Sequence, residues 1–192
     1  MVNCLKVNKI TDSELIESIR NGNQYAFSEI VSRYKSTINR TISGMIGKCD
    51  EVDDIGQEVF IRFFRSVNKF RGEAMLGTYL TRIAINLSLN EIKRRRIRNF
   101  LSIENMLSDG KDIADQSTNN SYDDNREIIK NAIQKLSPKY RSVLVLRLID
   151  TYSTEETAII LNLPIGTVLS RLARAQMKLK EYLKPHFQNY GK

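Results

Sequence analysis

Apolar residues recur at every third or fourth position along most of the chain, a spacing typical of amphipathic α-helices. The strict alternation of apolar and polar residues that is typical of β-strands is not evident. The pattern predicts a helix over residues 12–20, with Thr11 or Asp12 as its N-cap. A longer helix with an apolar stripe from Phe27 to Ile42 follows, and a third is expected over residues 51–67.

A loop over residues 68–73, which contains Gly72, separates the third helix from a fourth. The fourth helix places apolar residues between Leu76 and Leu87 inward and continues into a basic run that begins at Lys93. Together these four helices predict a first domain over residues 1–98.

Residues 99–125 are rich in Ser, Asn and Asp and have little periodicity, which is typical of a flexible linker. These 27 residues would span about 90 Å when fully extended but only about 30 Å as a relaxed coil. Helical periodicity resumes over residues 126–136, and the Ser137-Pro138 pair opens another helix with proline at a tolerated first-turn position.

The last part of the chain carries the clearest local signal. Ser153 and Glu156 have the spacing of a capping box, which predicts the start of a helix. A turn at residues 162–164 separates it from a last helix over residues 165–183, and two helices joined in this way form a helix-turn-helix candidate. We therefore expect an all-α protein, with a second small helical domain over residues 126–192 joined to the first by the flexible linker.

Charge is distributed unevenly along the chain. The 30 Lys and Arg residues against 22 Asp and Glu residues give a net charge of +8. Residues 1–50, 51–100 and 126–192 carry +2, +4 and +7, whereas residues 101–125 carry −5. Two basic domains joined by an acidic linker make nucleic acid the first candidate partner, because non-specific affinity for nucleic acid is largely electrostatic. Solubility alone would be the simpler explanation of the net charge.

The cysteines and the single histidine give no sign of a metal site. Cys4 and Cys49 are isolated, His186 lies near the end of the chain, and no CxxC or HxxxH spacing occurs. No apolar run is long enough to cross a bilayer, and no signal peptide is evident. We therefore expect a cytoplasmic protein with reduced thiols, without a cofactor or metal, and not inserted in a membrane.

The last predicted helix has two distinct faces. The inner face is apolar and comprises Val168, Leu172, Ala175 and Leu179. The outer face is polar and comprises Thr167, Ser170, Arg171, Arg174 and Lys178. Arg suits guanine O6 and N7 in the major groove, Ser and Thr are adaptable donors, and Lys suits phosphate. The outer face fits a DNA-recognition helix, although an ordinary amphipathic helix would also expose a polar face.

The third and fourth predicted helices carry two further candidate surfaces. One stripe of the third helix places an apolar residue among acids and amides, as in a protein-docking patch: Asp54, Gln57, Glu58, Ile61 and Arg65. The carboxylates of Asp53, Asp54 and Glu58 are explained more simply by a solvated helix N-terminus than by a metal.

On the fourth helix, Arg82, Asn86, Asn90 and Lys93 are followed by a basic run that ends at Arg98. Basic residues interleaved with aromatic ones fit single-stranded DNA, whose bases stack on rings. Phe70 and Tyr79, which flank the Gly72 loop, supply such rings, but they would also serve as core residues.

Two sets of motifs resemble the sigma-70 family of bacterial RNA polymerase sigma factors. The first set resembles the sigma-2 domain and comprises DDIGQEVFIR, FRGE and TYLTRIAIN at residues 53–62, 70–73 and 78–86. The second resembles the sigma-4 helix-turn-helix domain and comprises LSPKYR, EETA and PIGTVLSRLARA at residues 136–141, 155–158 and 164–175. The short linker between them is similar to that of the extracytoplasmic-function (ECF) subgroup.

The resemblance implies a protein without catalytic activity that directs promoter-specific transcription initiation. The implied site for the clamp helices of the polymerase β′ subunit comprises Asp54, Gln57, Glu58, Ile61 and Arg62. The implied site for recognition and melting of the −10 element comprises Phe70, Arg71, Gly72, Tyr79, Arg82, Asn86, Lys93 and Arg94. The implied site for the −35 element comprises Thr167, Ser170, Arg171, Arg174 and Lys178. The resemblance also implies contact with the polymerase β flap and an anti-sigma partner.

Three residues depart from the family pattern. Tyr79 stands where the family usually has Trp, Thr157 replaces a usual Ile, and Leu169 replaces a frequent Lys. These changes leave the fold intact but alter the expected stacking and remove one expected phosphate contact.

The promoter elements read by such a protein lie roughly 55–70 Å apart, farther than the relaxed linker reaches. We therefore expect the two domains to sit closer together in the free protein and to bind DNA weakly without polymerase.

Two other functions account for part of the sequence. A conventional helix-turn-helix repressor or activator would explain residues 137–183 but gives no reason for the loop at Gly72 or the patch at Ile61. A DNA-processing enzyme such as a recombinase with a helix-turn-helix tail would need a nucleophile or metal constellation, and no persuasive one is present.

Overall fold

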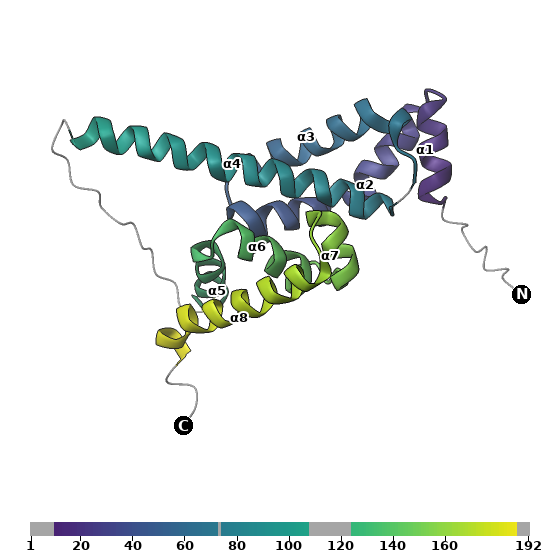
Figure 1. Ribbon diagram of the computed structural model, residues 1–192. Helices are drawn as coiled ribbons and strands as arrows, with labels where there is room; N and C mark the ends of the chain where they lie inside the picture. The colour runs from purple at the N-terminus through teal and green to yellow at the C-terminus, as the bar shows by residue number, and fades with distance from the viewer. Residues whose placement is uncertain (1–9, 73, 108–123, 188–192) are drawn as a thin grey trace, which may run out of the picture.

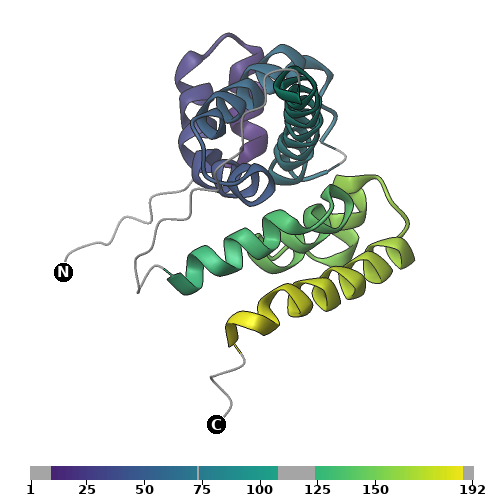
Figure 2. The same ribbon diagram turned by 90° about the vertical axis from the view of Figure 1, so that its left-hand side faces the viewer.

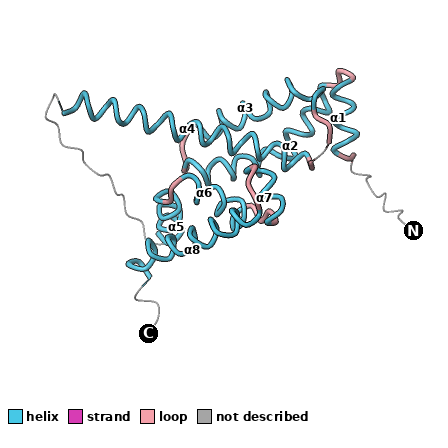
Figure 3. The backbone as a smooth tube through the Cα atoms, in the orientation of Figure 1, coloured by secondary structure: helices cyan, strands magenta, loops and turns pink. Residues whose placement is uncertain are grey.

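The structure, a computed structural model, describes residues 10–72, 74–107 and 124–187. Within these ranges the chain forms helices joined by short loops and turns, with no strand (Figure 3). The all-α fold expected from the periodicity is therefore confirmed. Most of the predicted linker, residues 108–123, lies outside the described residues, as do Cys4 and Glu73.

The N-terminal unit is a bundle of four helices. They are α1 (Asp12–Arg20), α2 (Gln24–Ile46), α3 (Glu51–Ser66) and α4 (Leu76–Leu107), with a short 3₁₀ turn, η1 (Val67–Lys69), after α3. The predicted bounds of α1 are confirmed, and Thr11 is its N-cap, forming a capping box with Glu14. The core of the bundle contains fully buried residues from three helices, such as Ile38, Phe63 and Leu80.

Helix α4 is longer than the sequence pattern suggests. It runs to Leu107, beyond residue 98 where we expected the first domain to end, and its last turns project from the bundle (Figure 1). Ile97 and Phe100 are more than half exposed there, so packing on a core does not hold this part of the helix. No Gly or Pro occurs between Gly77 and Gly110, and a helix without such breakers propagates at little cost once formed.

The C-terminal unit contains the expected helix-turn-helix. Its helices are α5 (Asp124–Lys135), α6 (Pro138–Leu144), α7 (Thr154–Leu161) and α8 (Ile165–Phe187), with a π-helical segment, η2 (Val145–Ile149), after α6. The predicted capping box of Ser153 and Glu156 starts α7, and Asn162 in a left-handed conformation ends it. Helix α8 continues four residues past the expected end at residue 183, with Pro185 inside it.

The π-helical segment changes which residues face the N-terminal unit. The amide of Asp150 donates to the carbonyl of Val145 at 2.9 Å, and the amide of Tyr152 donates to that of Leu146 at 3.0 Å. Leu148, within this segment, is half exposed. The wider turn directs the Asp150 and Tyr152 side chains toward α2 and α4. Such π segments often occur at functional positions.

The two units pack directly against each other along a surface that we call the interdomain seam (Figure 2). Its apolar part joins Val145, Leu146 and Ile160 to the core of the N-terminal bundle, where each is no more than 2% exposed. Gly44 of α2 lies so close to Val145 that a Cβ atom at this glycine would be 3.0 Å from a Val145 methyl. Separation of the units would therefore expose a well-packed apolar surface.

The polar part of the seam is centred on Asp150. Its carboxylate is buried and accepts hydrogen bonds from Arg40 Nε at 2.9 Å and Thr41 Oγ1 at 2.7 Å. The Tyr152 hydroxyl lies 2.7 Å from Thr81 Oγ1 of α4, and burial raises the pKa of this phenol. Buried polar groups are stable only when they are paired, so these bonds fix one docking geometry.

The C-terminus of α2 lies in the seam, and side chains of the other unit cap part of it. The last four carbonyls of a helix lack partners inside that helix. In α2 each of these four carbonyls accepts a hydrogen bond. The Ser43 carbonyl accepts from the Gly47 amide, and the Ile46 carbonyl accepts from Arg95 Nη1 at 3.1 Å. The Gly44 carbonyl accepts from Gln134 Nε2 at 2.9 Å, and the Met45 carbonyl accepts from Arg141 Nη1. Gln134 and Arg141 belong to the C-terminal unit. Half of the capping of α2 therefore depends on the contact between the units.

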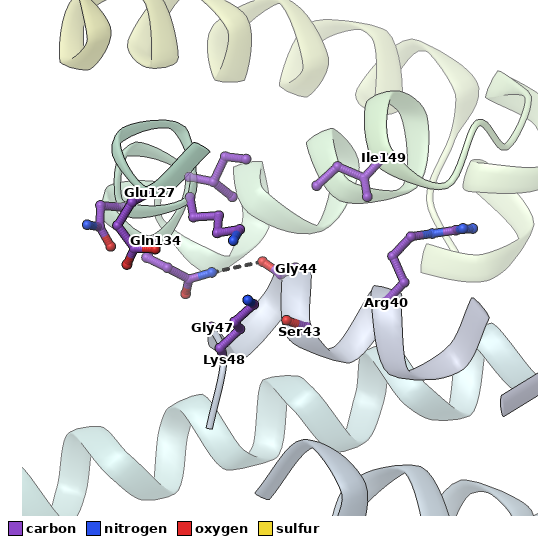
Figure 4. A pocket seen from close by; sticks show the side chains of 11 residues that line it. Arg40, Ser43, Gly44, Gly47, Lys48, Glu127, Gln134 and Ile149 are labelled. Atoms are coloured by element: carbon purple, nitrogen blue, oxygen red, sulfur yellow. Dashed lines mark hydrogen bonds between the residues drawn. The ribbon is translucent and has the colours of Figure 1, made fainter. Parts of the chain in front are cut away.

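A cavity of about 370 Å³ opens on the seam between α2 and α5 (Figure 4). The Gln134 side chain reaches across it to the Gly44 carbonyl, and Arg40, Lys48 and Ile149 also line it. The seam is thus tightly packed around Val145 and looser toward α5.

Candidate nucleic-acid interface

The recognition face, defined as Thr167, Ser170, Arg171, Arg174 and Lys178, lies along α8. Val168 and Ala175 are fully buried on the inner side of this helix, so the other side faces outward. Ser170 and Arg174 are exposed, and the other three residues are half-buried. The structure thus brings all five predicted residues onto one helix, and their contact with DNA stays a prediction.

Helix α6 adds two residues to this surface that the sequence pattern did not reveal. The Arg174 guanidinium beside the Tyr140 hydroxyl lowers the pKa of that phenol, with smaller contributions from the nearby charges of Lys139 and Lys178. The Lys139 ammonium group lies 5.0 Å from the centre of the Tyr140 ring. Both residues belong to the LSPKYR motif, but only the packing of α6 against α8 brings them next to the recognition face.

The second predicted DNA site forms what we call the loop surface: Phe70, Arg71, Gly72, Tyr79, Arg82, Asn86, Lys93 and Arg94. Its polar members are exposed, as is Gly72, which has a φ of 72° in the left-handed region. On α4, Arg82, Asn86 and Lys93 lie on one outer side, and Arg94 follows Lys93. The loop and this side of α4 therefore present one cationic surface.

The two aromatic residues of the loop surface belong to a ring cluster. The ring centres of Phe70 and Tyr79 are 5.0 Å apart, and each lies 6.4 Å from that of Phe63. The Tyr79 hydroxyl lies 3.0 Å from Ser66 Oγ at the end of α3. Both rings are half-buried and hold the loop against α3, so the packing explanation weighed for them accounts for their position.

Helix α1 also holds the loop. Arg20 donates to the backbone carbonyls of Phe70 and Val67, the latter at 3.3 Å from both Nε and Nη2. The guanidinium therefore fixes the point at which the chain leaves η1. At the other end of the loop, Met75 is 78% exposed. This residue is an apolar contact candidate that the periodicity of α4 gave no reason to single out.

A cavity of about 410 Å³ lies beneath the loop. Phe70, Gly72 and Met75 line one side of it. Tyr152 and Glu156 from the C-terminal unit line another. In this arrangement α7 lies against α4, and Glu156 of α7 lines the same cavity as the loop residues.

The basic run at the end of α4 is organised by one buried carboxylate. Glu91 is 7% exposed and pairs with Arg94 at 2.8 Å, Arg95 at 3.0 Å and Arg98 at 3.5 Å. Arg95 turns inward to α2, whereas Lys93 remains exposed on the loop surface. The run is therefore partly structural and partly available for anionic partners.

The predicted docking patch forms what we call the α3 face: Asp54, Gln57, Glu58, Ile61 and Arg62. Ile61 is 42% exposed, and Glu58 pairs with Arg62 at 2.7 Å. Phe64, 49% exposed and in edge contact with Phe27, adds an aromatic residue that the sequence pattern did not assign to this side. Helix α3 packs on α2 and α4 and lies on the side of the bundle away from α8 (Figure 1).

In residues 10–72, 74–107 and 124–187 no group of three or more His, Cys, Asp or Glu residues is placed to hold a metal ion. The Asp53 carboxylate accepts a hydrogen bond from Asn39 Nδ2 at 2.8 Å instead. No single helix of the described chain has the length and hydrophobicity to cross a bilayer. The pair α7 and α8, bent by 101°, meets those two criteria only when taken together.

Two family models match the chain in the order expected from the motifs. Sigma-70 region 2 matches residues 30–97, and Sigma-70, region 4 matches residues 126–179. The curated relatives include the ECF RNA polymerase sigma factor SigW of Bacillus subtilis, which is 33% identical over 177 residues. That alignment covers 88% of this chain and 95% of SigW. The ECF RNA polymerase sigma-E factor of Escherichia coli K12 is 32% identical over 185 residues, covering 92% of this chain and 96% of the relative.

Two solved structures share the fold. CnrH, in complex with the cytosolic domain of CnrY, gives a TM-score of 0.67 at 24% identity and covers 91% of this chain and 97% of CnrH. The sigma factor RpoE from Bartonella quintana, in complex with the anti-sigma factor NepR, gives a TM-score of 0.63 at 24% identity and covers 82% and 96% of the two chains.

The ring cluster predicts how Tyr79 variants behave. Tyr79→Phe keeps the ring contacts but removes the hydrogen bond to Ser66, so the free energy of unfolding should fall by about 1 kcal/mol. Tyr79→Ala should lower it by about 3 kcal/mol, because the contacts with Phe63 and Phe70 are also lost. Urea unfolding followed by circular dichroism measures both values. Tyr25→Ala, at a residue 88% exposed, is the control and should cost little. An unchanged stability of Tyr79→Ala would show that the ring does not hold the loop.

Proposed function

Because the chain belongs to the ECF RNA polymerase sigma factors of the sigma-70 family, we propose a role for each of its surfaces in promoter-specific transcription initiation. The protein is a transcription initiation factor that acts with core polymerase and promoter DNA. It supplies recognition and leaves catalysis to the polymerase, and it acts in the cytoplasm. The main evidence for this function is that the chain matches both region 2 and region 4, in this order.

The α3 face is the docking site for the polymerase core, on the clamp helices of the β′ subunit. Its apolar centre at Ile61, its neighbour Phe64 and the charged rim around them have the composition of a protein interface. It lies on the side of region 2 away from region 4, so the seam does not cover it. Polymerase can therefore dock on the closed protein. The β flap is the proposed partner of region 4.

The loop surface reads and melts the −10 element. The exposed cations Arg82 and Lys93 would follow the DNA backbone, and Asn86 is placed to contact a base. The cavity beneath the loop is open to solvent and offers a site for a base that leaves the stack. Since Tyr79 and Phe70 are tied into the ring cluster, they act by shaping this site more than by free stacking. Met75 is the exposed apolar side chain at its edge.

The recognition face enters the major groove of the −35 element. Arg171 and Arg174 supply guanidinium donors suited to guanine or phosphate, and Thr167 and Ser170 supply hydroxyl groups for adaptable hydrogen bonds. Lys139 on α6 adds a phosphate contact at the edge of this face. The inner side of α8 packs through Val168 and Ala175, so the helix approaches DNA as part of a rigid unit.

The interdomain seam makes the free protein a closed form. With region 4 packed on α2 and α4, Tyr152 and Glu156 line the cavity that serves the −10 element. Promoter elements roughly 55–70 Å apart cannot be read together by two units in direct contact. Docking on polymerase must therefore separate the units and break the bonds of Asp150 and Tyr152.

An anti-sigma factor is a further proposed partner. Among proteins of this fold, the RpoE structure contains the anti-sigma factor NepR. In this chain such a partner would act most simply by covering the α3 face, because the closed form leaves that surface accessible to polymerase.

Run-off transcription with a bacterial core polymerase tests the proposed function. The protein should produce transcripts from discrete sites that share two upstream elements at a fixed spacing. Ile61→Glu should abolish them by placing a charge at the centre of the α3 face, while Tyr25→Glu, at an exposed position of α2, should not. Absence of both transcripts and polymerase binding with an active core would contradict the assignment. Normal activity of Ile61→Glu would remove the α3 face as the docking site.

The seam predicts that the free protein binds promoter DNA weakly and that opening it strengthens binding. Asp150→Ala removes the acceptor for Arg40 and Thr41, which should weaken closure by about 1–2 kcal/mol and shift the closed–open equilibrium roughly 5- to 30-fold. Fluorescence anisotropy with promoter DNA should therefore show tighter binding of the variant without polymerase.

Loss of a negative charge alone also favours DNA binding, so Glu181→Ala serves as a control matched in charge. Glu181 is exposed on α8 and its removal leaves the seam intact. Equal affinities of the two variants would show that electrostatics and not closure limits DNA binding by the free protein.

A further inference from the structure

Helix α8 exposes an apolar stripe next to the recognition face. Ile165, Leu169 and Ala173 stand four residues apart, on successive turns, and all three are exposed. Ile165 is 47% exposed and Leu169 is 52% exposed. Single exposed apolar residues are common on protein surfaces. Here three of them line one side of the helix that is proposed to enter DNA.

The stripe and the recognition face occupy opposite flanks of the same outward surface. Each residue of an α-helix is rotated about 100° from the one before it. From the buried Val168, this rotation places Leu169 on one flank, Ser170 on the outward side and Arg171 on the other flank. Gly166, whose missing side chain would meet nothing within 4 Å, lies on the open surface between the flanks. A helix in the major groove, which is nearly as narrow as the helix itself, presents both flanks to the DNA.

The chemistry of Leu169 restricts what it can contact there. Its side chain has no donor, so it gains nothing from phosphate, which is the partner that a Lys at this position would take. In the major groove only thymine presents an apolar group, the C5-methyl, at the base edge. Burial of one such group against a leucine contributes a factor of about four in affinity.

We propose that Leu169 reads the C5-methyl group of a thymine in the −35 element, on the flank of α8 opposite to Arg171. This inference rests on the proposed function, in which α8 enters the −35 major groove. It adds a determinant of promoter specificity that acts without hydrogen bonds and differs from the cationic contact expected at this position. The departure of Leu169 from the family pattern is then a change in sequence preference as well as the loss of a phosphate contact.

A protein partner is the other class of ligand that would cover an apolar stripe. The stripe shares its outward surface with Ser170, however. Its member Ala173 is adjacent to Arg174 of the recognition face, and Thr167 is two residues from both Ile165 and Leu169. A protein seated on the stripe would block the recognition face. Contact of the stripe with DNA is compatible with DNA binding by the recognition face, so DNA is the favoured ligand of the stripe.

The test uses holoenzyme assembled from the full chain and a core polymerase that supports its transcription. Selection from a promoter library with a randomised −35 element first identifies the preferred sequence. Each thymine of that element, on either strand, is then replaced by deoxyuridine, which lacks only the methyl group. Wild-type holoenzyme should lose about fourfold in promoter affinity at one position, and Leu169→Ala should show no loss at that position.

Two further variants sharpen the result. Leu169→Lys should also lose the methyl sensitivity, and the slope of log affinity against log salt should steepen by about one because a phosphate contact is gained. Met177→Ala is the matched control: Met177 is 57% exposed on the same helix, two turns beyond Leu169, and this variant should keep the full sensitivity.

The outcomes separate this inference from the proposed function. If −35 sequence changes matter but no thymine methyl does, or if Leu169→Ala retains the methyl sensitivity, the role of Leu169 is refuted while −35 recognition stands. A role for Leu169 in protein docking would appear as weaker holoenzyme assembly by Leu169→Ala with unchanged methyl sensitivity. If no −35 sequence dependence exists, the proposed function of α8 fails as well.

Discussion

The carbonyl groups at the C-terminal end of α2 are the constraint on which the closed structure depends. A helix end buried against another unit needs partners for its last carbonyls. Gln134 and Arg141 of region 4 provide two of them, and the buried Asp150 carboxylate binds Arg40 and Thr41 one to two turns earlier on the same helix. Arg141 itself is 7% exposed, and burial lowers the pKa of its guanidinium. Removal of region 4 from α2 would therefore leave polar groups on both sides to be rehydrated, in addition to exposing the apolar surface around Val145.

This constraint links the fold to the order of events in initiation. The α3 face remains exposed in the closed form, whereas the cavity beneath the loop is lined in part by Tyr152 and Glu156. In the proposed function, polymerase would bind first and supply the free energy that separates the units, after which the loop surface and the recognition face would reach promoter elements too far apart for the closed form. A sigma factor with this structure would bind promoters weakly without polymerase, because its two proposed DNA-binding surfaces act together only when polymerase sets the distance between them.

The helices and the two candidate DNA surfaces follow from local signals in the sequence. The capping boxes at Thr11 and Ser153, the turn at Asn162 and the two faces of α8 are all short-range features, and the structure has each of them. The seam could not be predicted in this way. Its bonds from Asp150 to Arg40 and Thr41 join positions 110 and 109 residues apart, and a π-helical segment that periodicity does not reveal directs the carboxylate inward. The length of α4 was not predicted either, because Ile97 and Phe100 are exposed and no buried apolar stripe marks this part of the helix in the sequence.

The distance between regions 2 and 4 distinguishes a closed free protein from an open initiation complex. Spin labels introduced at Tyr25 on α2 and Met177 on α8, both exposed, would report it by double electron–electron resonance after Cys4 and Cys49 are replaced by Ser. We expect one narrow distance distribution in the free protein and a longer distance in the complex with core polymerase and promoter DNA, consistent with the roughly 55–70 Å between the elements. The same distance in both states, or a broad distribution in the free protein, would contradict this expectation.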